Sequence, residues 1–378
     1  WNGNQIALTT HRNYVSFICI VNGQPDTQYT NEDVTLSNPF SSMSHSMEQG
    51  YLIVYIHCGM AIGFYNGDMS HLMKEDFQEL KPTIFLAGGG FYKLLFAIIE
   101  KEMIRVFEKG FCLYLLVAIR LKVFAKGLIP CVLKRFSVSA QNLKNLMGGR
   151  IRLMLTSGVL MSNEVGVTLK SIMACPFINT YGLTEANAVS RAKTEESDFT
   201  HIGGPSPAFE FKVKDLPELE YLSTDKDEYG RSMPRGQLCI RGAPVFKGYY
   251  KDAQRTADVL DKDGWLQTGD AVQINLNGSL KLIDRINNLF RNAAGEELVP
   301  SNIEGVFCEC PSISEFLIYG DGTRHFNVAI VVPKKSSVLK LLGITNSLQE
   351  DEYEQLLQSS IVKKAILQEI QEKSSHPR

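Results

Sequence analysis

The sequence predicts an α/β protein with a second, smaller region at its carboxyl-terminal end. Three short apolar runs that each end in a glycine-containing loop carry this prediction: residues 82–90 (PTIFLAGGG), 150–158 (RIRLMLTSG) and 175–185 (CPFINTYGLTE). Stretches with helical patterning separate them, as is typical of buried strands in an α/β core. Ligands collect at the carboxyl ends of strands in such sheets, so we expect these loops to line a binding site.

The pattern changes from Gln237 onward. The runs GQLCIRG, GWLQTGDAVQI and SLKLIDR are short strands with Gly and Asn turns, which predicts an antiparallel β region. Residues 217–236 before it are polar and rich in Gly and Pro, so we expect a connection there. A smaller domain is predicted to begin at Arg285, with strand-like FLIYGDG and FNVAIVVP followed by helices. We therefore divide the chain into residues 1–284 and 285–378.

Composition bounds the class of protein. The chain has 378 residues, of which 44% are hydrophobic and 21% charged, which suits about two globular domains. Its formal net charge of −2 gives no overall attraction to nucleic acid. The eight cysteines include no CxxC pair, and Cys308 and Cys310 are separated by one residue. We expect reduced thiols in a cytosolic setting.

Several apolar stretches bear on membrane contact. Residues 51–64 and 111–119 are shorter than the roughly 20 residues that a spanning helix needs, so we expect buried helix or strand. Residues 1–12 are polar and do not resemble a signal peptide. Residues 109–135 mix basic and apolar side chains without a single acid. This stretch fits either an anionic membrane surface or a packed helical segment with a solvated basic face.

The run YGLTE at residues 181–185 is a candidate phosphate and metal site. Gly182 would let the backbone approach a flat ligand or a phosphate. Thr184 offers a hydroxyl to a phosphate oxygen, and Glu185 offers a hard oxygen ligand to Mg²⁺, which binds through few carboxylates plus nucleotide phosphates. Taken alone, the run also fits an ordinary strand-end loop.

Three further side chains are candidates. Asp270, in TGD, could accept hydrogen bonds from the two hydroxyls of a ribose, although an isolated Gly-Asp is usually a turn. Arg285 could contact the ribose or a phosphate with its planar fork, although an Asp-Arg pair is usually a surface ion pair. His45 stands in SMSHSMEQ, and a lone histidine in an apolar context is more often a satisfied core residue.

The order of these motifs resembles the eukaryotic long-chain acyl-CoA synthetases of the adenylate-forming superfamily. LTTHRN, SMSHSMEQ, GFYNGD, LKPTIF, GGRIRLMLTSG, YGLTE and HIGGPSP are followed by VFKGYYKD, TGD, the DR pair and GEELVP. The likeness covers most of the chain. It implies a large AMP-binding domain of layered α/β sheets with a small β region, then a hinge and a smaller α+β domain.

The resemblance also implies roles for the candidate residues. Tyr181 and Gly182 would flank the adenine, Thr184 would contact the α-phosphate, and Glu185 would hold Mg²⁺. A separate set would complete the site: Asp270 on the ribose, Arg285 beside it, Asp284 at the hinge and His45 near the acyl carboxylate. The substrates implied are ATP, a long-chain fatty acid and CoA, with no nucleic acid. The implied location is cytoplasmic, with peripheral contact at the endoplasmic reticulum or another intracellular membrane.

Departures from the family pattern leave a second interpretation open. No Ser/Thr/Gly-rich phosphate loop ending in Pro-Lys-Gly precedes LTTHRN, and Lys363, Lys364 and Lys373 do not stand in the family's catalytic-lysine motif. Residues 88–90 are three glycines where the family has Val-Pro-Arg. The chain is therefore expected to be either a partial copy of a fatty acid–CoA ligase or a non-catalytic relative that binds nucleotide, acyl groups or a membrane surface.

Overall fold

The structure is a computed structural model. It describes residues 6–37, 42–68, 71–108, 141, 144–158, 161–291, 297–320, 326–344 and 350–375, without the side chains of 101–108 and 350. The basic stretch 109–135 lies outside the described residues, so its two interpretations stay predictions. All six cysteines within the described ranges are free thiols.

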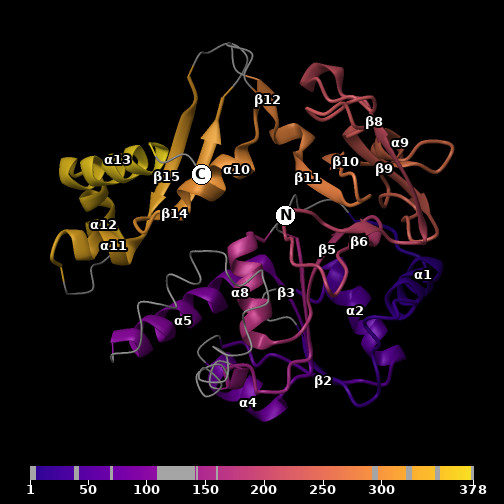
Figure 1. Cartoon of the computed structure of the whole chain (residues 1–378), viewed down its shortest axis with the longest axis horizontal. Coiled ribbons are helices and arrows are strands. Elements are labelled where there is room, and N and C mark those ends of the chain that lie inside the picture. Colours follow the sequence, from indigo (N-terminus) through magenta and orange to yellow (C-terminus); the bar gives the residue numbers. More distant parts are fainter. Residues whose placement is uncertain are drawn as a thin grey trace.

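A seven-stranded sheet organises the first half of the chain (Figure 1). Its strand order is β2-β1-β3-β4-β5-β6-β7, with the first five strands parallel and the last two antiparallel. The strands are β1 (Val34–Leu36), β2 (Ala61–Gly63), β3 (Ile84–Gly88), β4 (Leu153–Ser157), β5 (Phe177–Leu183), β6 (Asn187–Arg191) and β7 (Gly204–Pro205). The three predicted runs are β3, β4 and β5, which lie side by side, so their carboxyl-terminal loops share one edge as expected.

Helices cover both faces of this sheet. They are α1 (His11–Asn22), α2 (Ser46–His57), the π-helical turn η1 (Leu72–Asp76), α4 (Phe77–Leu80), α5 (Gly89–Glu108) and α8 (Asn163–Met173). Successive residues of β3 alternate between two cores: Phe85 packs with α5 and α8, whereas Ile84 packs with α1 and α2. Such alternation is what a strand buried on both faces requires. The apolar run 51–64 forms α2 and β2, and no described helix is long and apolar enough to cross a bilayer.

A four-stranded antiparallel sheet follows, in the order β11-β10-β9-β8. It comprises β8 (Phe209–Lys214), β9 (Arg235–Gly242), β10 (Leu266–Ile274) and β11 (Leu280–Arg285), with η3 (Pro217–Leu219) and α9 (Ala253–Val259) in its connections. The antiparallel β region is confirmed, but it begins earlier than predicted. Because β8 precedes it, the polar stretch 217–236 connects two strands of this sheet instead of leading into it. The alternation in FEFKVK was the signal for the missed strand.

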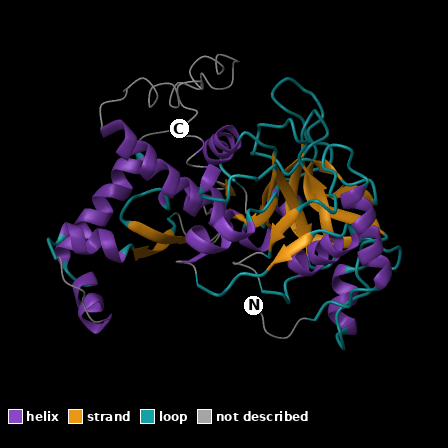
Figure 2. Cartoon of the chain, turned by 90° about the horizontal axis from the view of Figure 1, so that it is seen from below, coloured by secondary structure: helices purple, strands orange, loops and turns teal. Residues whose placement is uncertain are grey.

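The rest of the chain lies beside these two sheets, in orange and yellow in Figure 1. Its elements are η4 (Ile286–Asn288), β12 (Phe290–Arg291), β13 (Glu297–Leu298), α10 (Pro300–Phe307), β14 (Ile313–Tyr319), β15 (Val328–Pro333), α11 (Lys335–Leu341), α12 (Glu350–Leu357) and α13 (Ser360–Ser374). Figure 2 shows the strand pair β14–β15 with helices around it. Two small apolar clusters of its own hold this region together. The predicted strands in FLIYGDG and FNVAIVVP are confirmed, and the domain boundary at Arg285 stays a prediction.

Candidate functional site

A cleft of about 2150 Å³ opens where the two sheets and α10 meet. It is lined by the loop after β3, the carboxyl end of β5, the start of α2, strands β10 and β11, and one face of α10. All eight candidate residues of the sequence line it: His45, Tyr181, Gly182, Thr184, Glu185, Asp270, Asp284 and Arg285. Residues up to 240 positions apart are thus brought into one cavity.

Strand β5 carries the YGLTE run to the edge of the cleft. Its apolar residues are buried in both faces of the sheet, while Gly182 is exposed. A Cβ atom added at Gly182 would lie 2.4 Å from the carbonyl oxygen of Asn187 on β6. Only glycine therefore fits where the ladder shifts its register between Tyr181 and Gly182. Gly182 therefore lines the cleft with backbone that carries no side chain.

Asp270 sits at the centre of the polar contacts. The strand pairing places it directly opposite Arg285, and the two side chains form an ion pair with Arg285 Nε 2.9 Å from Asp270 Oδ1. The Tyr181 hydroxyl donates to Asp270 Oδ2 from the other sheet. The backbone of Asp270 is fixed as well, because its N–H donates to Thr268 Oγ1 at 3.1 Å. Asp270 is only 2% exposed, so its carboxylate is presented by a rigid frame.

Burial governs the electrostatics here. It raises the pKa of Asp270, although the hydrogen bond from Tyr181 and the charge of Arg285 pull that pKa down. The neighbouring carboxylates of Glu185 and Asp284 raise it further. Burial and the charge of Asp270 raise the pKa of Tyr181 well above its usual value, so its hydroxyl stays a neutral donor. The site thus contains a buried carboxylate with fewer donors than it can use.

Glu185 and Thr184 lie at the mouth of β5. The hydroxyl of Tyr249 donates to Glu185 Oε1 at 2.6 Å, and the N–H of Phe246 donates to the Glu185 carbonyl at 2.7 Å. Thr184 is exposed, and its Oγ1 accepts from Ser46 Oγ at 3.4 Å. No group of three His, Cys, Asp or Glu side chains suited to a metal occurs within the described ranges. The single Glu185 carboxylate with a nearby hydroxyl fits Mg²⁺ that arrives already bound to phosphates, because that ion keeps several non-protein ligands.

His45 has a structural role that the sequence did not indicate. It is the N-cap of α2, and its Nδ1 accepts from the N–H of Met47 at 3.2 Å. The side chain is exposed and lines the cleft. Its capping bond orients the ring, and contact with an acyl carboxylate stays a prediction.

Asp284 joins two parts of the chain. Its Oδ2 accepts from the N–H of Ser301 at 3.1 Å, at the second residue of α10, and its Oδ1 accepts from Asn288 Nδ2 at 2.9 Å. It therefore caps a helix that begins 16 residues later. This cap ties the end of β11 to the start of α10, where the sequence predicts a hinge.

Comparison with known proteins decides the family. The family model described as AMP-binding enzyme matches residues 6–250. The chain belongs to the AMP-binding enzyme family.

Relatives and solved structures agree with this assignment. The chain is 33% identical over 375 residues to the long-chain-fatty-acid–CoA ligase 5 of Rattus norvegicus, covering 97% of this chain and 52% of that ligase. It is 31% identical to the peroxisomal long chain acyl-CoA synthetase 7 of Arabidopsis thaliana, over 96% of this chain and 50% of that protein. The chain thus spans about half the length of the curated relatives it matches. Its fold matches the A domain of carboxylic acid reductase from Segniliparus rugosus in complex with AMP and a carboxylic acid, with a TM-score of 0.68, 24% identity and 96% and 52% of the two chains covered.

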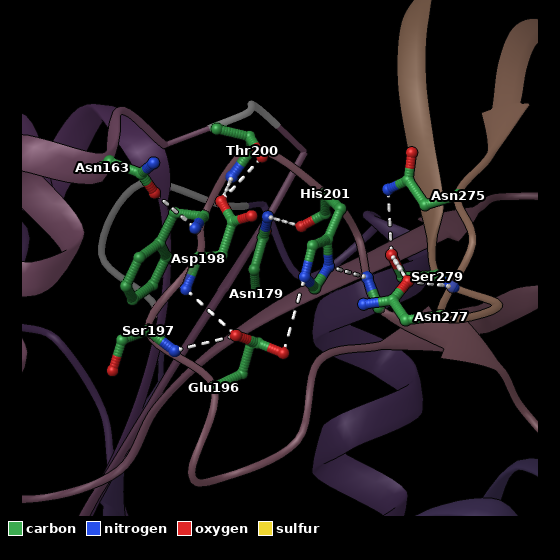
Figure 3. Close-up of polar contacts among 12 residues, drawn as sticks. Asn163, Asn179, Glu196, Ser197, Asp198, Thr200, His201, Asn275, Asn277 and Ser279 are labelled. Carbon is green, nitrogen blue, oxygen red and sulfur yellow. Dashed lines mark hydrogen bonds and ion pairs between the residues drawn. The ribbon is translucent and has the colours of Figure 1, made fainter. Parts of the chain in front are cut away.

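Figure 3 shows a group of polar contacts around the buried His201. His201 Nδ1 accepts from the N–H of Gly203 at 3.0 Å, and its Nε2 lies 3.6 Å from Glu196 Oε2. Asn179 on β5 donates to the His201 carbonyl at 3.0 Å. These contacts fix the segment that carries Thr200 to the cleft wall. HIGGPSP was recognised as a family motif, but its sequence gives no sign of the contact with Asn179.

Tyr249 is the most informative residue that the sequence reasoning missed. It lies in VFKGYYKD, a motif that carries the family resemblance but predicts no role for this tyrosine. Its hydroxyl is the hydrogen-bond donor to Glu185. A tyrosine in a loop 64 residues from its partner carries no periodic signal. The motif itself, rich in aromatic residues and glycine, was the available clue.

Proposed function

We propose that the chain binds ATP and takes part in activating a long-chain fatty acid as its acyl-adenylate, followed by acyl transfer to CoA. The observation that carries this proposal is the buried Asp270 carboxylate, held between Tyr181 and Arg285 in the wall of a large cleft. A carboxylate with spare acceptor capacity suits the paired 2′- and 3′-hydroxyls of a ribose. The relatives' names support the choice of a long-chain fatty acid and CoA as the other substrates.

The proposed roles follow the lining of the cleft. Asp270 accepts from the ribose hydroxyls, and Arg285 keeps that carboxylate in place while its exposed side contacts the ribose or a phosphate. The adenine lies against the backbone at Tyr181 and Gly182, and the Thr184 hydroxyl contacts the α-phosphate. His45 is placed to meet the acyl carboxylate, and Asp284 marks the hinge.

The reaction is a substitution at phosphorus followed by one at carbon. The fatty-acid carboxylate forms a bond to the α-phosphorus of ATP as the bond to pyrophosphate breaks. The CoA thiol, having lost its proton, then forms a thioester with the acyl carbon as AMP leaves. Glu185 would hold Mg²⁺, which neutralises charge on the phosphates. The chain's own residues contribute mainly positioning, which is where most catalysis of this kind resides.

A second candidate is nucleotide binding without turnover. Gly88, Gly89 and Gly90 line the cleft where the resemblance implies Val-Pro-Arg, and a Cβ at Gly90 would meet no atom within 4 Å. The cleft wall is therefore open at a point where Val-Pro-Arg would supply larger side chains and a positive charge. The ligand site around Asp270 does not depend on those three residues.

Isotope exchange separates the two candidates. The chain is incubated with ATP, Mg²⁺, labelled pyrophosphate and palmitate, and label in ATP is measured; octanoate and acetate serve as chain-length controls. Palmitate-dependent exchange supports adenylation. AMP binding by calorimetry without exchange under any acid supports the second candidate, and absence of both results contradicts the proposed function.

We also propose that residues 109–135 contact anionic membrane surfaces, on the strength of their basic and apolar composition. Flotation with anionic and neutral liposomes tests this. A preference for anionic lipid that weakens with salt is expected, and equal recovery with both lipids would contradict it.

A further inference from the structure

The side chain of Glu185 is held by one hydroxyl. Tyr249 donates to its Oε1 at 2.6 Å, while Oε2 accepts no hydrogen bond from the part of the chain that the structure describes. We propose that Tyr249 is a positioning residue that fixes Glu185 so that its second oxygen is presented to a divalent cation carried by the phosphates of a nucleotide. This inference rests on the proposed function, because it assumes that Glu185 meets such a cation.

Tyr249 is itself rigidly placed. Its N–H donates to Thr256 Oγ1 at 2.9 Å, and its ring meets Phe246 edge to face with centroids 4.9 Å apart. Phe246 in turn donates its N–H to the Glu185 carbonyl, so the donor and the acceptor of the key bond share a backbone link. The turn between them is tight, because a Cβ at Gly248 would lie 2.6 Å from Thr256 Cγ2. The hydroxyl therefore reaches Glu185 from a nearly fixed point.

The surroundings explain why a fixed carboxylate is needed. Arg255 and Arg285 line the same cleft as Tyr249 and Glu185 and bring positive charge to it. Without the hydroxyl, no described side chain would hold the Glu185 carboxylate by a hydrogen bond, and its position relative to a metal would no longer be fixed.

Groups that orient a metal ligand usually affect affinity strongly. Removing such a partner lowers metal affinity about 10- to 100-fold. The change Tyr249→Phe removes one oxygen and keeps the ring that packs on Phe246. Tyr250→Phe is a matched control, because Tyr250 is the adjacent residue, is 50% exposed, and its hydroxyl makes no hydrogen bond to the described part of the chain.

Mn²⁺ binding in the presence of saturating ATP, followed by electron paramagnetic resonance, tests the proposal without any turnover. ATP that is free in solution also binds Mn²⁺, and a titration without protein measures this contribution so that it can be subtracted. We expect Tyr249→Phe to weaken Mn²⁺ binding about 10-fold, while AMP affinity measured without metal stays within about twofold of the parent. Glu185→Gln should weaken it at least as much, and adding Tyr249→Phe to Glu185→Gln should have no further effect. Tyr250→Phe should bind as the parent does.

Each alternative result has a distinct meaning. If Tyr249→Phe binds Mn²⁺ as tightly as the parent or more tightly, Tyr249 has no positioning role. Glu185→Gln tests separately whether Glu185 binds the metal. An equal loss of AMP affinity in Tyr249→Phe also overturns it, because that marks general damage to the cleft. If Glu185→Gln leaves Mn²⁺ binding unchanged, or if the parent binds no nucleotide, the proposed function itself fails and this inference fails with it.

Discussion

Two buried aspartates, one at the amino ends of the strands of the seven-stranded sheet and one on β10 of the four-stranded sheet, differ in how well they are paired. Asp33 precedes β1 and is 3% exposed, and Asp270 lies in the cleft and is 2% exposed. Asp33 accepts from Arg152 Nε at 2.7 Å, from Thr83 Oγ1 at 2.7 Å and from the Thr30 N–H at 2.9 Å. These partners precede β1, β3 and β4, so the cluster sits at the amino ends of the strands. Among the described residues, the Asp270 carboxylate has only the hydrogen bond from Tyr181 and the ion pair with Arg285.

The difference shows in their acidities. Burial alone would raise the pKa of Asp33, but hydrogen bonds from Arg152 and Thr83 outweigh it and lower that pKa to about 2. Burial raises the pKa of Asp270, and the hydrogen bond from Tyr181 and the charge of Arg285 do not offset it. One carboxylate is therefore stabilised where it sits, and the other is kept partly unsatisfied beside a cavity. We infer from this contrast that Asp33, at the amino ends of the strands, stabilises the fold. The Asp270 carboxylate in the cleft can still accept hydrogen bonds from a ligand.

The largest effect should come from unpairing Asp33. Arg152→Met leaves a buried carboxylate with only hydroxyl and backbone donors, and we expect about 2–3 kcal/mol lower free energy of unfolding, near the lower end for a broken buried ion pair. Urea unfolding measures this. Arg285→Met is the control at the other site; its side chain is 58% exposed, so we expect a loss within about 1 kcal/mol. Equal losses in the two variants would remove the contrast.

Acid sensitivity should also separate the two aspartates. The folded-state pKa of Asp33, about 2, lies below its unfolded value of 3.8. Its stabilisation is therefore present above about pH 4 and is lost as pH falls through 2. We expect Asp33→Asn to lower stability at pH 7 by about 1–2 kcal/mol, allowing for solvent screening of the half-exposed Arg152. Its stability should also fall less steeply than the parent's between pH 4 and 2. Parallel pH profiles would contradict this.

The smallest effect on stability should come from Asp270→Asn. The pKa of Asp270 is raised in the folded state, so its contribution to stability is present only below the unfolded pKa and is lost as pH rises through the folded value. At pH 7 the charged group therefore opposes folding. The asparagine oxygen can still accept from Tyr181. We expect stability unchanged or up to about 1 kcal/mol higher. A melting temperature lower by more than about 4 °C would show that Asp270 is a structural residue.

Much of this arrangement could be read from the sequence, and the limits have physical causes. The strand runs ending at Gly88 and Leu183 were predictable because buried parallel strands are continuous apolar segments. Asp270 and Arg285 could be singled out because they stand in recognisable motifs. The bond from Tyr181 to Asp270 could not, since it joins residues of two different sheets, 89 positions apart. Asp284 likewise caps a helix across a loop, which local capping rules do not anticipate.

The most direct test of the account compares two nucleotides on two proteins by titration calorimetry. AMP and 2′,3′-dideoxy-AMP are titrated into the parent and into Asp270→Asn. If Asp270 holds the ribose, the parent should bind dideoxy-AMP more weakly than AMP by about 1.5–3 kcal/mol, the range for hydrogen bonds to a charged group. Asp270→Asn should discriminate much less between them, since the two changes remove the same interaction. If the parent does not distinguish the nucleotides, or if Asp270→Asn discriminates as strongly as the parent, Asp270 does not hold the ribose.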